Sequence, residues 1–283
     1  RGMTQLVAVL GVGVVPADTA VVGADDLGIN RGDGVFDAAR VVVDAAGTRV
    51  EFLDEHLARF ERSHALMGMA APDLAAWRGL IADAVAAWDA PGEAVVKLIA
   101  TRGQEHAPTE PGASFLTITA SGTAPCPPLR LVTLTTGRRA DAFAGAPWLL
   151  GGVKSLSYAV NVAVAREARR RGVDDVLFTS ADGYCLEGPR SGLLALVDGV
   201  YATTPVEGTG ILDSVTIAAV RAGLAARGTT VVDRLLTPAD LVGAEAAWLL
   251  SAGRGVCDIV ALDGTPLRTD AEASALLRGL AGF

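Results

Sequence analysis

Lysine is rare in this chain, and that makes each lysine a candidate for chemistry. The sequence has 24 lysines and arginines, of which only Lys97 and Lys154 are lysines. Arginine stays protonated and cannot form a Schiff base, whereas a partly desolvated lysine can attack a carbonyl group. Lys154 is flanked by glycines, just before an expected helix. This context favours an imine-forming lysine, and chance retention on a solvated face is the alternative for both lysines.

A second candidate is Glu187, in the segment Cys185-Leu186-Glu187-Gly188 at the end of a short expected strand. A carboxylate beside a pyridine nitrogen keeps that nitrogen protonated and strengthens the ring as an electron sink. Taken alone, Glu187 is more typical of an ordinary turn carboxylate than of a cofactor-binding residue.

Residues 208–216 could bind a phosphate, because a glycine-rich loop there leads into the N-terminus of an expected helix. Unpaired N–H groups and the helix dipole favour an anion at such a position. The segment lacks the Gly-Lys-Ser/Thr of a Walker loop, and a plain capped helix is the alternative. Arg59 lies on an earlier helix and, by itself, could be a surface arginine.

Other kinds of site have little support. The three histidines, His56, His64 and His106, show no metal-ligand spacing, and no Ser/His/Asp arrangement can be assembled, so we expect no metal. The net charge is −8 and the pI is about 4.9, without a basic stripe. We therefore expect no nucleic-acid partner.

The apolar segments and cysteines predict a cytoplasmic protein. No apolar run reaches the roughly 18 to 20 residues of a membrane span. The segment Leu6–Val15 is interrupted by glycines and follows no basic region, so we expect neither a membrane segment nor a signal peptide. Cys126, Cys185 and Cys257 are odd in number and isolated, which favours reduced thiols.

Hydrophobic periodicity and turn residues predict a mixed α and β chain in two domains. A Pro/Gly-rich linker at 121–128 would separate a smaller α/β domain, 1–120, from a larger domain, 129–283, that carries Lys154. The expected strands are 34–43, 48–52, 94–101, 114–120, 129–135, 175–179, 193–197 and 247–251. The expected helices begin at Asp54, capped by that residue and ending near Met69, at Pro72-Asp73, at Tyr158 and near Asp213-Ser214.

In order along the chain, several short motifs resemble the class-IV aminotransferase family. That family includes branched-chain aminotransferases, D-amino-acid aminotransferases and 4-amino-4-deoxychorismate lyase. The similarity covers most of residues 25–265, and each motif alone is short. The motifs are Gly32-Asp33-Gly34-Val35-Phe36 with Arg40, His56-Leu57-x-Arg59, Gly152-Val153-Lys154-Ser155-Leu156, Glu187-Gly188 with Ser191, Thr203-Thr204-Pro205, and Gly210-Ile211-Leu212 through Thr216.

The resemblance implies a two-domain, α+β enzyme of fold type IV, like D-amino-acid aminotransferase, that uses pyridoxal 5'-phosphate (PLP) and forms a homodimer. Lys154 would form the Schiff base, and Glu187 would pair with the pyridine nitrogen. The phosphate would be held by Arg59, by Thr216 and by the backbone at Val215. Tyr158 would be a partner of the cofactor's phenolic oxygen.

Three positions depart from the family pattern. Gly192 stands where asparagine is frequent, and Ile217 stands where an arginine commonly follows the phosphate-binding threonine. A further phosphate-side hydroxyl of branched-chain enzymes falls near Ala252, although Ser251 is adjacent. These departures weaken the branched-chain assignment in particular.

Within the family, residues 95–103, Arg40 and Ser251-Ala252 resemble the lyase, which would release pyruvate and 4-aminobenzoate, a folate precursor. Arg40 and Lys97 are the expected ligands of substrate carboxylates, with an interdomain ion pair as the alternative. Lys97 and Arg102 would point to opposite faces of a regular strand. Substrate choice would depend on residues 104–111, which include His106.

The second functional hypothesis is a PLP-dependent transaminase, of the D-amino-acid type rather than the branched-chain type. A non-catalytic binding protein that keeps the fold is the third. The presence of both Lys154 and Glu187 argues against that third hypothesis.

Overall fold

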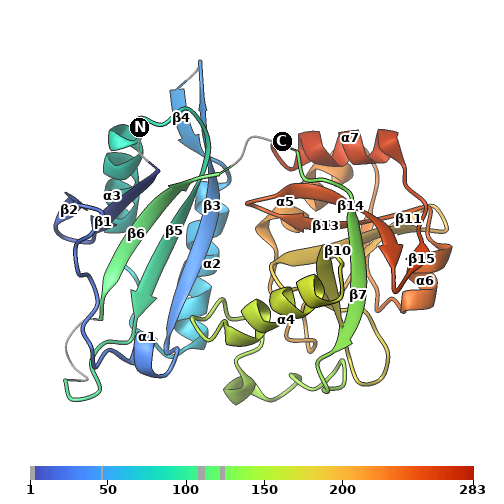
Figure 1. Ribbon diagram of the computed structural model, residues 1–283, viewed down its shortest axis with the longest axis horizontal. Helices are drawn as coiled ribbons and strands as arrows, with labels where there is room; N and C mark the ends of the chain where they lie inside the picture. Colours follow the sequence, from blue (N-terminus) through green and yellow to red (C-terminus); the bar gives the residue numbers. More distant parts are fainter. Residues whose placement is uncertain (1–3, 46, 108–111, 122–124) are drawn as a thin grey trace. The chain divides into compact units, whose positions relative to one another are not determined.

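The computed structural model describes residues 4–45, 47–107, 112–121 and 125–283, which form two compact units (Figure 1). Unit 1 comprises residues up to Ala124 together with Val153–Tyr158. Unit 2 comprises Pro125–Gly152 and Ala159–Phe283. Part of the expected linker, residues 122–124, lies outside the described residues. No helix among the described residues is long and apolar enough to cross a membrane.

Unit 1 is an antiparallel six-stranded sheet in the order β2-β1-β6-β5-β3-β4. Buried residues of two helices, such as Phe60 and Trp77, pack with Val35 and Leu116 on one face of this sheet, and Figure 1 shows those helices behind the strands. The elements are β1 (Gln5–Val9), β2 (Gly13–Val15), α1 (Leu27–Asn30), β3 (Gly34–Asp44), β4 (Gly47–Val50), α2 (Leu53–Leu66), α3 (Leu74–Ala87), β5 (Gly92–Thr101) and β6 (Ser114–Ala120).

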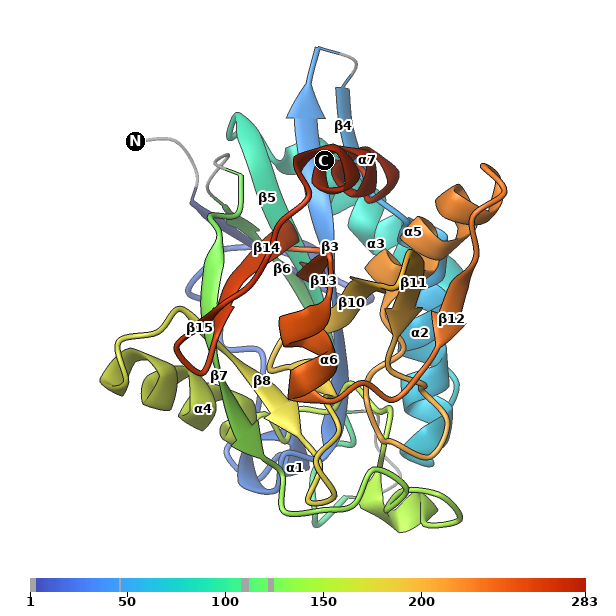
Figure 2. The same ribbon diagram turned by 90° about the vertical axis from the view of Figure 1, so that its right-hand side faces the viewer.

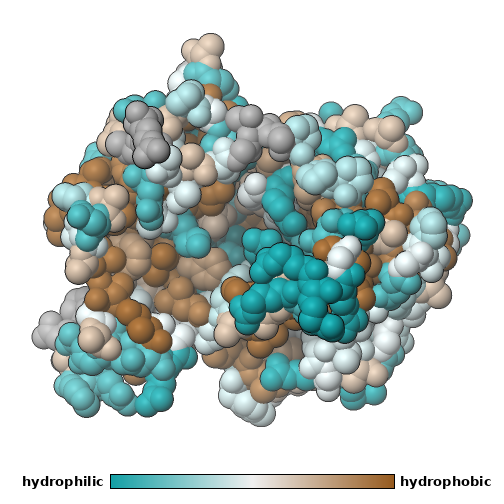
Figure 3. All heavy atoms as spheres, in the orientation of Figure 1, coloured by the Kyte–Doolittle hydropathy of each residue, from teal (hydrophilic) through white to brown (hydrophobic). Residues whose placement is uncertain are grey.

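The opposite face of the same sheet carries candidate site residues. Phe36 pairs with Ile99, and Ala38 pairs with Lys97, so these four side chains share one face. Because side chains alternate along a strand, Asp37 points to the helix-covered face. Figure 3 shows apolar side chains gathered over β5 and β6, on the face turned to the viewer.

The starts of α2 and α3 differ from each other in their caps. Asp73 accepts a hydrogen bond from the Ala76 N–H at 3.0 Å, which confirms the expected start of α3. The expected cap of α2 is wrong, because Phe52 occupies that position in a left-handed conformation and gives no side-chain hydrogen bond. Asp54 lies instead in the first turn, where its negative charge interacts favourably with the helix dipole. Its Oδ1 atom also lies 2.6 Å from Nη1 of Arg78.

The structure differs from the expected domain division at Lys154. The segment Val153–Tyr158 belongs to unit 1, because it extends the edge of β3. The Phe36 N–H donates to the Lys154 carbonyl at 2.9 Å, and the Leu156 N–H donates to the Gly34 carbonyl at 2.9 Å. These backbone hydrogen bonds join residues about 120 positions apart, which local sequence patterns do not reveal.

Unit 2 is built on a nine-stranded sheet whose main path is β12-β11-β10-β13-β14-β7-β8, with β9 on β10 and β15 on β14. Its strands are β7 (Leu129–Thr135), β8 (Asp175–Thr179), β9 (Glu187–Gly188), β10 (Ser191–Val197), β11 (Val200–Thr203), β12 (Val231–Asp233), β13 (Ala246–Ser251), β14 (Gly255–Leu262) and β15 (Thr265–Pro266). Its helices are the 3₁₀ turn Pro147–Leu149, α4 (Ala159–Arg170), α5 (Val215–Ala225), α6 (Pro238–Gly243) and α7 (Ala271–Leu280).

The central strands of unit 2 are buried on both faces. Leu193 packs in one apolar cluster with Leu241 of α6, whereas its neighbour Leu194 packs in another with Val220 of α5 and Leu277 of α7. Consecutive strand residues point to opposite faces, so near-continuous apolar runs are needed here. The three helices can be followed in Figure 2.

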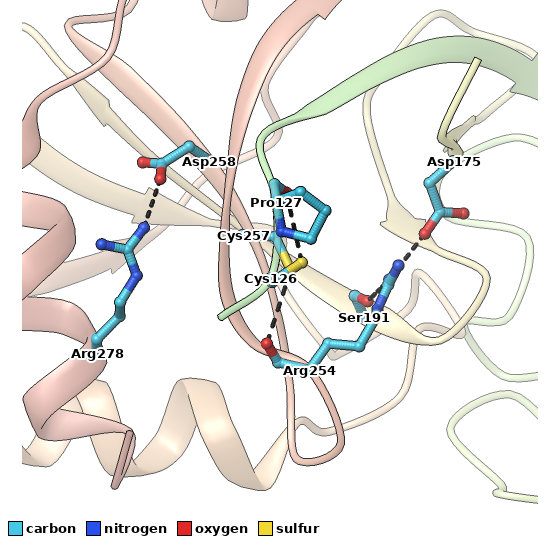
Figure 4. Close-up of a disulfide and its surroundings, with 8 residues drawn as sticks. All are labelled: Cys126, Pro127, Asp175, Ser191, Arg254, Cys257, Asp258 and Arg278. Atoms are coloured by element: carbon cyan, nitrogen blue, oxygen red, sulfur yellow. Dashed lines mark hydrogen bonds and ion pairs between the residues drawn. A yellow bond between two sulfur atoms is a disulfide. The ribbon is translucent and has the colours of Figure 1, made fainter. Parts of the chain in front are cut away.

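Two of the three cysteines form a disulfide, which corrects the expectation that all three are reduced (Figure 4). Cys126 and Cys257 are 131 residues apart in sequence, but their Cα atoms lie 5.3 Å apart. The cause is the parallel pairing of β7 with β14, in which Leu129 lies opposite Ile259 shortly after the two cysteines. Cys185 is free, and burial raises the pKa of its thiol to about 12.

We expect Cys126→Ser to lower the free energy of unfolding of unit 2 by about 2–4 kcal/mol, because a disulfide restricts the unfolded chain. The midpoint of urea unfolding, measured with and without dithiothreitol, tests this. Wild type should lose stability when reduced, and Cys126→Ser should no longer respond to the reductant. Cys185→Ala is the matched control and should keep the response. An equal midpoint for oxidised and reduced wild type would contradict the stabilising role.

Candidate active site

The Lys154 side chain in unit 1 lies against two aromatic rings. Its Nζ atom is 4.4 Å from the centroid of the Phe36 ring and 5.8 Å from that of Tyr158. The two rings meet edge to face, with centroids 5.3 Å apart. Aromatic walls attract an ammonium group and also remove part of its hydration, which favours a reactive amine. Lys154 and Tyr158 are thus brought together within unit 1.

Lys97 contacts the same aromatic ring. Its Nζ atom is 5.7 Å from the Phe36 centroid, and the residue is exposed on the sheet face that carries Phe36. Both lysines of the chain therefore meet at one ring. Phe36 belongs to a motif that the sequence singled out, but its contact with both amines depends on strand register and could not be read from spacing.

The guanidinium of Arg40 is already engaged within unit 1. Its Nε donates to Glu93 Oε2 at 2.9 Å, its Nη2 also contacts that carboxylate, and the residue is buried. The partner lies on the adjacent strand β5, so the ion pair is internal to one unit rather than interdomain. A substrate carboxylate would have to compete with Glu93 for this arginine.

Arg102 directly follows the last residue of β5, so the alternation of side chains along a strand does not set its direction. Its Nε donates to Asp33 at 2.6 Å, and its Nη2 donates to the Met67 carbonyl at 2.6 Å, at the C-terminus of α2. Arginine at a helix C-terminus satisfies carbonyls that have no partner within the helix. His106 is exposed, and residues 108–111 of the expected substrate loop lie outside the described residues.

Arg59 is buried in a polar cluster with Asp37 and His56. Its Nε donates to Asp37 Oδ2 at 2.8 Å and its Nη2 donates to Oδ1 at 2.8 Å, while His56 Nδ1 lies 2.7 Å from Oδ1. Burial alone would raise the pKa of the Asp37 carboxyl, but the Arg59 charge and the hydrogen bonds from Arg59 and His56 outweigh it and hold that pKa well below its usual value.

In unit 2, Glu187 lies on β9 and is half-buried. Its Oε2 atom accepts a hydrogen bond from the Leu212 N–H at 3.2 Å. This contact fixes the carboxylate from the loop that precedes α5. The sequence singled out both segments, and the structure brings them together.

The N-terminus of α5 carries the expected phosphate-binding residues. Ser214 caps the helix by accepting from the Ile217 N–H, and Val215 and Thr216 are buried in the first turn. No hydrogen bond to another described residue occupies the Thr216 hydroxyl. A buried hydroxyl beside the first N–H groups of an 11-residue helix fits an anionic ligand.

Ser251 lies at the end of β13, where it pairs with Gly255 across a tight turn. Arg254 within this turn donates through Nη2 to Asp175 at 2.7 Å and to Ser191 at 2.7 Å (Figure 4). Arg254 therefore ties the turn beside Ser251 to β8 and β10. Sequence reasoning missed this residue, because its partners are 63 and 79 positions away.

Two departures from the family pattern are in contact. A Cβ atom added to Gly192 would lie 2.6 Å from Ile217 Cδ1 and 3.3 Å from the Ser214 Cβ. Any side chain at position 192 would therefore displace Ile217. Position 192 and Ile217 therefore share one packing environment beside the start of α5.

The comparisons with known proteins identify the family. Residues 34–262 match the model of amino-transferase class IV, so the chain belongs to that family. It is 35% identical over 263 residues to the bifunctional aminodeoxychorismate lyase / D-amino acid transaminase of Mycobacterium tuberculosis (strain ATCC 25618 / H37Rv), covering 86% of each chain.

Solved structures show the same fold. The fold IV-transaminase CpuTA1 from Curtobacterium pusillum matches with a TM-score of 0.89 and 37% identity, over 99% of this chain and 100% of that one. The PLP-bound form of a hypothetical aminotransferase from Mycobacterium tuberculosis matches with a TM-score of 0.89 and 31% identity, over 98% and 97% of the chains. The chain is therefore a PLP-dependent enzyme of fold type IV, and the third hypothesis, a non-catalytic binding protein, does not hold.

Each unit, taken by itself, offers groups of the kind that PLP needs. In unit 1, a lysine amine against aromatic rings suits the aldehyde. In unit 2, a carboxylate fixed by a backbone N–H suits the pyridine nitrogen, and a helix N-terminus with a buried hydroxyl suits the phosphate. Sequence reasoning missed the Asp37 contact with Arg59. One signal was available, because the spacing of His56 and Arg59 puts both on one face of a helix.

Proposed function

We propose that the protein is a 4-amino-4-deoxychorismate lyase that acts in the supply of a folate precursor. The observation that carries the proposal is the meeting of both lysine amines at the Phe36 ring, where one amine can do chemistry and the other can attract a substrate carboxylate. The lyase part of the name of the Mycobacterium tuberculosis relative supports this reaction.

In this proposal Lys154 is the Schiff-base lysine, and its amine then moves the proton of the substrate's amine-bearing carbon. When bound, PLP supplies an electron sink for the electrons left on that carbon. Glu187 keeps a proton on the pyridine nitrogen, and Tyr158 donates to the phenolic oxygen. The phosphate is held by Arg59, the Val215 N–H, the Thr216 hydroxyl and Ser251.

The proposed reaction balances without a second substrate. Lys154 removes the proton from the amine-bearing carbon, and the bond between the neighbouring ring carbon and the enolpyruvyl oxygen breaks. The departing group takes up a proton to become pyruvate, while the ring becomes the aromatic 4-aminobenzoate. No keto acid and no oxidant are consumed, because the reaction is an elimination within one substrate. The aromatisation of the ring makes this elimination favourable.

A transaminase of the D-amino-acid type is the second candidate, and the other half of the relative's name favours it. Lys154 would then carry a proton between the substrate carbon and the C4′ carbon of the cofactor. Both reactions need Lys154 and Glu187, so those residues do not discriminate between them.

Pyruvate release from 4-amino-4-deoxychorismate, with no keto acid added, tests the proposal. A lactate dehydrogenase assay should detect pyruvate in amounts equal to the 4-aminobenzoate formed. If the protein turns over D-alanine with 2-oxoglutarate but releases no pyruvate from 4-amino-4-deoxychorismate, the transaminase would replace the lyase as the proposed function. Lys154→Ala protein should be inactive in both assays and serves as the blank.

Lys97 is proposed to bind a substrate carboxylate, with Arg40 as a weaker candidate because of its ion pair with Glu93. We expect Lys97→Ala to raise KM for the dicarboxylate substrate roughly tenfold with a smaller change in kcat, because a hydrogen bond to a charged group is lost. Steady-state kinetics measure the split, and Lys97→Arg, which keeps the charge, should recover most of the affinity. An unchanged KM would remove Lys97 from the substrate site.

The proposal includes a homodimer and a cytoplasmic location. The homodimer is supported by the family resemblance alone, and sedimentation at working concentration tests it. The Cys126–Cys257 disulfide weighs against the cytoplasmic location, because disulfides persist mainly in oxidising compartments. Alkylating thiols in intact cells before lysis would reveal whether the pair is oxidised there.

A further inference from the structure

The Asp37 carboxylate is fully buried and makes two hydrogen bonds to the Arg59 guanidinium. Asp37 Oδ1 also accepts from His56, whose Nδ1 lies 2.7 Å away. Because this carboxylate is ionised, the proton of that contact belongs to His56 Nδ1. Two side chains of α2, His56 and Arg59, thus bind the Asp37 carboxylate, and this carboxylate in turn fixes Arg59.

The geometry restricts Arg59 more than a single contact would. Nε and Nη2 bind the two oxygens of one carboxylate, which fixes both the position and the plane of the guanidinium. A freely rotating arginine side chain loses rotamer entropy when it binds an anion, so a restrained one loses less. The cluster therefore presents Arg59 in a defined orientation.

Asp37 also connects this cluster to the lysine. It follows Phe36 on β3, and the two side chains point to opposite faces of the strand. The Phe36 ring contacts the Lys154 amine, and the Phe36 N–H donates to the Lys154 carbonyl. Two consecutive residues of β3 thus contact two proposed cofactor-binding residues. Phe36 contacts Lys154, and Asp37 contacts Arg59.

We propose that Asp37, braced by His56, is a positioning residue that orients Arg59 toward the phosphate of PLP. This inference rests on the proposed role of Arg59. Asp37 itself would not contact the cofactor, so replacing Asp37 should weaken the binding only of ligands that carry the phosphate.

Binding of PLP and of pyridoxal, which lacks the phosphate, to the apoprotein tests the proposal without any assay of activity. We expect Asp37→Asn, which removes the charge but keeps the shape, to weaken PLP binding roughly tenfold or more. Pyridoxal binding should change less than about twofold, because Arg59 does not contact it. Asp37→Glu should recover part of the loss. Absorbance titration of each ligand gives both dissociation constants.

Arg59→Gln separates failure of this inference from failure of the proposed function. Arg59→Gln should also lose affinity for PLP only, and adding Asp37→Asn to it should cost little more. Equal losses for both ligands in Arg59→Gln would overturn the role of Arg59 and this inference with it. A phosphate-specific loss in Arg59→Gln but not in Asp37→Asn would overturn only the role of Asp37.

Asp37→Asn leaves a buried arginine without its counter-charge and could fail to fold. In that case His56→Gln carries the test, because it removes one support of Asp37 and keeps the Asp37–Arg59 pair. It should weaken PLP binding about twofold to fivefold while pyridoxal binding stays the same. Unchanged PLP binding in folded His56→Gln would overturn the inference.

Discussion

Lys154→Ala is expected to lower kcat by roughly 10³-fold or more, because it removes both the amine that carries the cofactor and the group that moves the substrate proton. The Lys154 amine lies 4.4 Å from the Phe36 ring, and the contacts of the backbone segment with β3 do not depend on the side chain. The variant should therefore fold normally and lose chemistry rather than stability. Steady-state turnover of 4-amino-4-deoxychorismate measures the effect.

Addition of a small primary amine distinguishes lost chemistry from lost structure. Methylamine should restore part of the turnover of Lys154→Ala, because it can take the place of the missing side-chain amine. The same amine should leave wild-type turnover almost unchanged. Activity of Lys154→Ala within about tenfold of wild type would remove Lys154 from the centre of the mechanism.

Glu187→Gln is expected to lower kcat on the order of 10²- to 10³-fold, the range seen when one electrostatic stabiliser is removed from an active site. Glutamine has the same length and can still accept from the Leu212 N–H, so the local structure should persist. What is lost is the negative charge that would keep the pyridine nitrogen protonated. Single-turnover kinetics of the PLP-loaded variant measure the effect.

Glu207→Gln is a matched control for that substitution, because Glu207 is an exposed glutamate of the same unit. It should leave kcat within about twofold of wild type, as surface substitutions usually have small effects. A Glu187→Gln enzyme that binds PLP normally and keeps kcat within about threefold would contradict the role given to Glu187.

Some of the regular elements could be predicted from the sequence, whereas others, such as α6 and α7, were not expected. Strands β6, β7 and β8 begin and end at the expected residues, because apolar alternation and flanking turn residues are local signals. The start of α2 was harder to predict. An aspartate near a helix start usually caps it, but here Phe52 adopts a left-handed conformation and the helix starts one residue before Asp54.

Two long-range contacts were beyond local reasoning. The edge of β3 pairs with the Lys154 segment, and the parallel pairing of β7 with β14 brings together the cysteines of the disulfide. Each contact joins residues more than 100 positions apart, and spacing along the chain carries no information about them. The resemblance singled out Lys154, Glu187 and Thr216 in order, but it gave neither their partners nor the cluster around Asp37.

The most direct test of the account is to locate the cofactor on the protein. Borohydride reduction of the PLP-loaded enzyme should fix the cofactor covalently, and peptide mass spectrometry should find it on Lys154. Lys97, the only other lysine in the chain, is an internal control, since its amine lies near the same Phe36 ring. Cofactor on Lys154 alone is the predicted result. Cofactor on Lys97, or none on either lysine, would contradict the account.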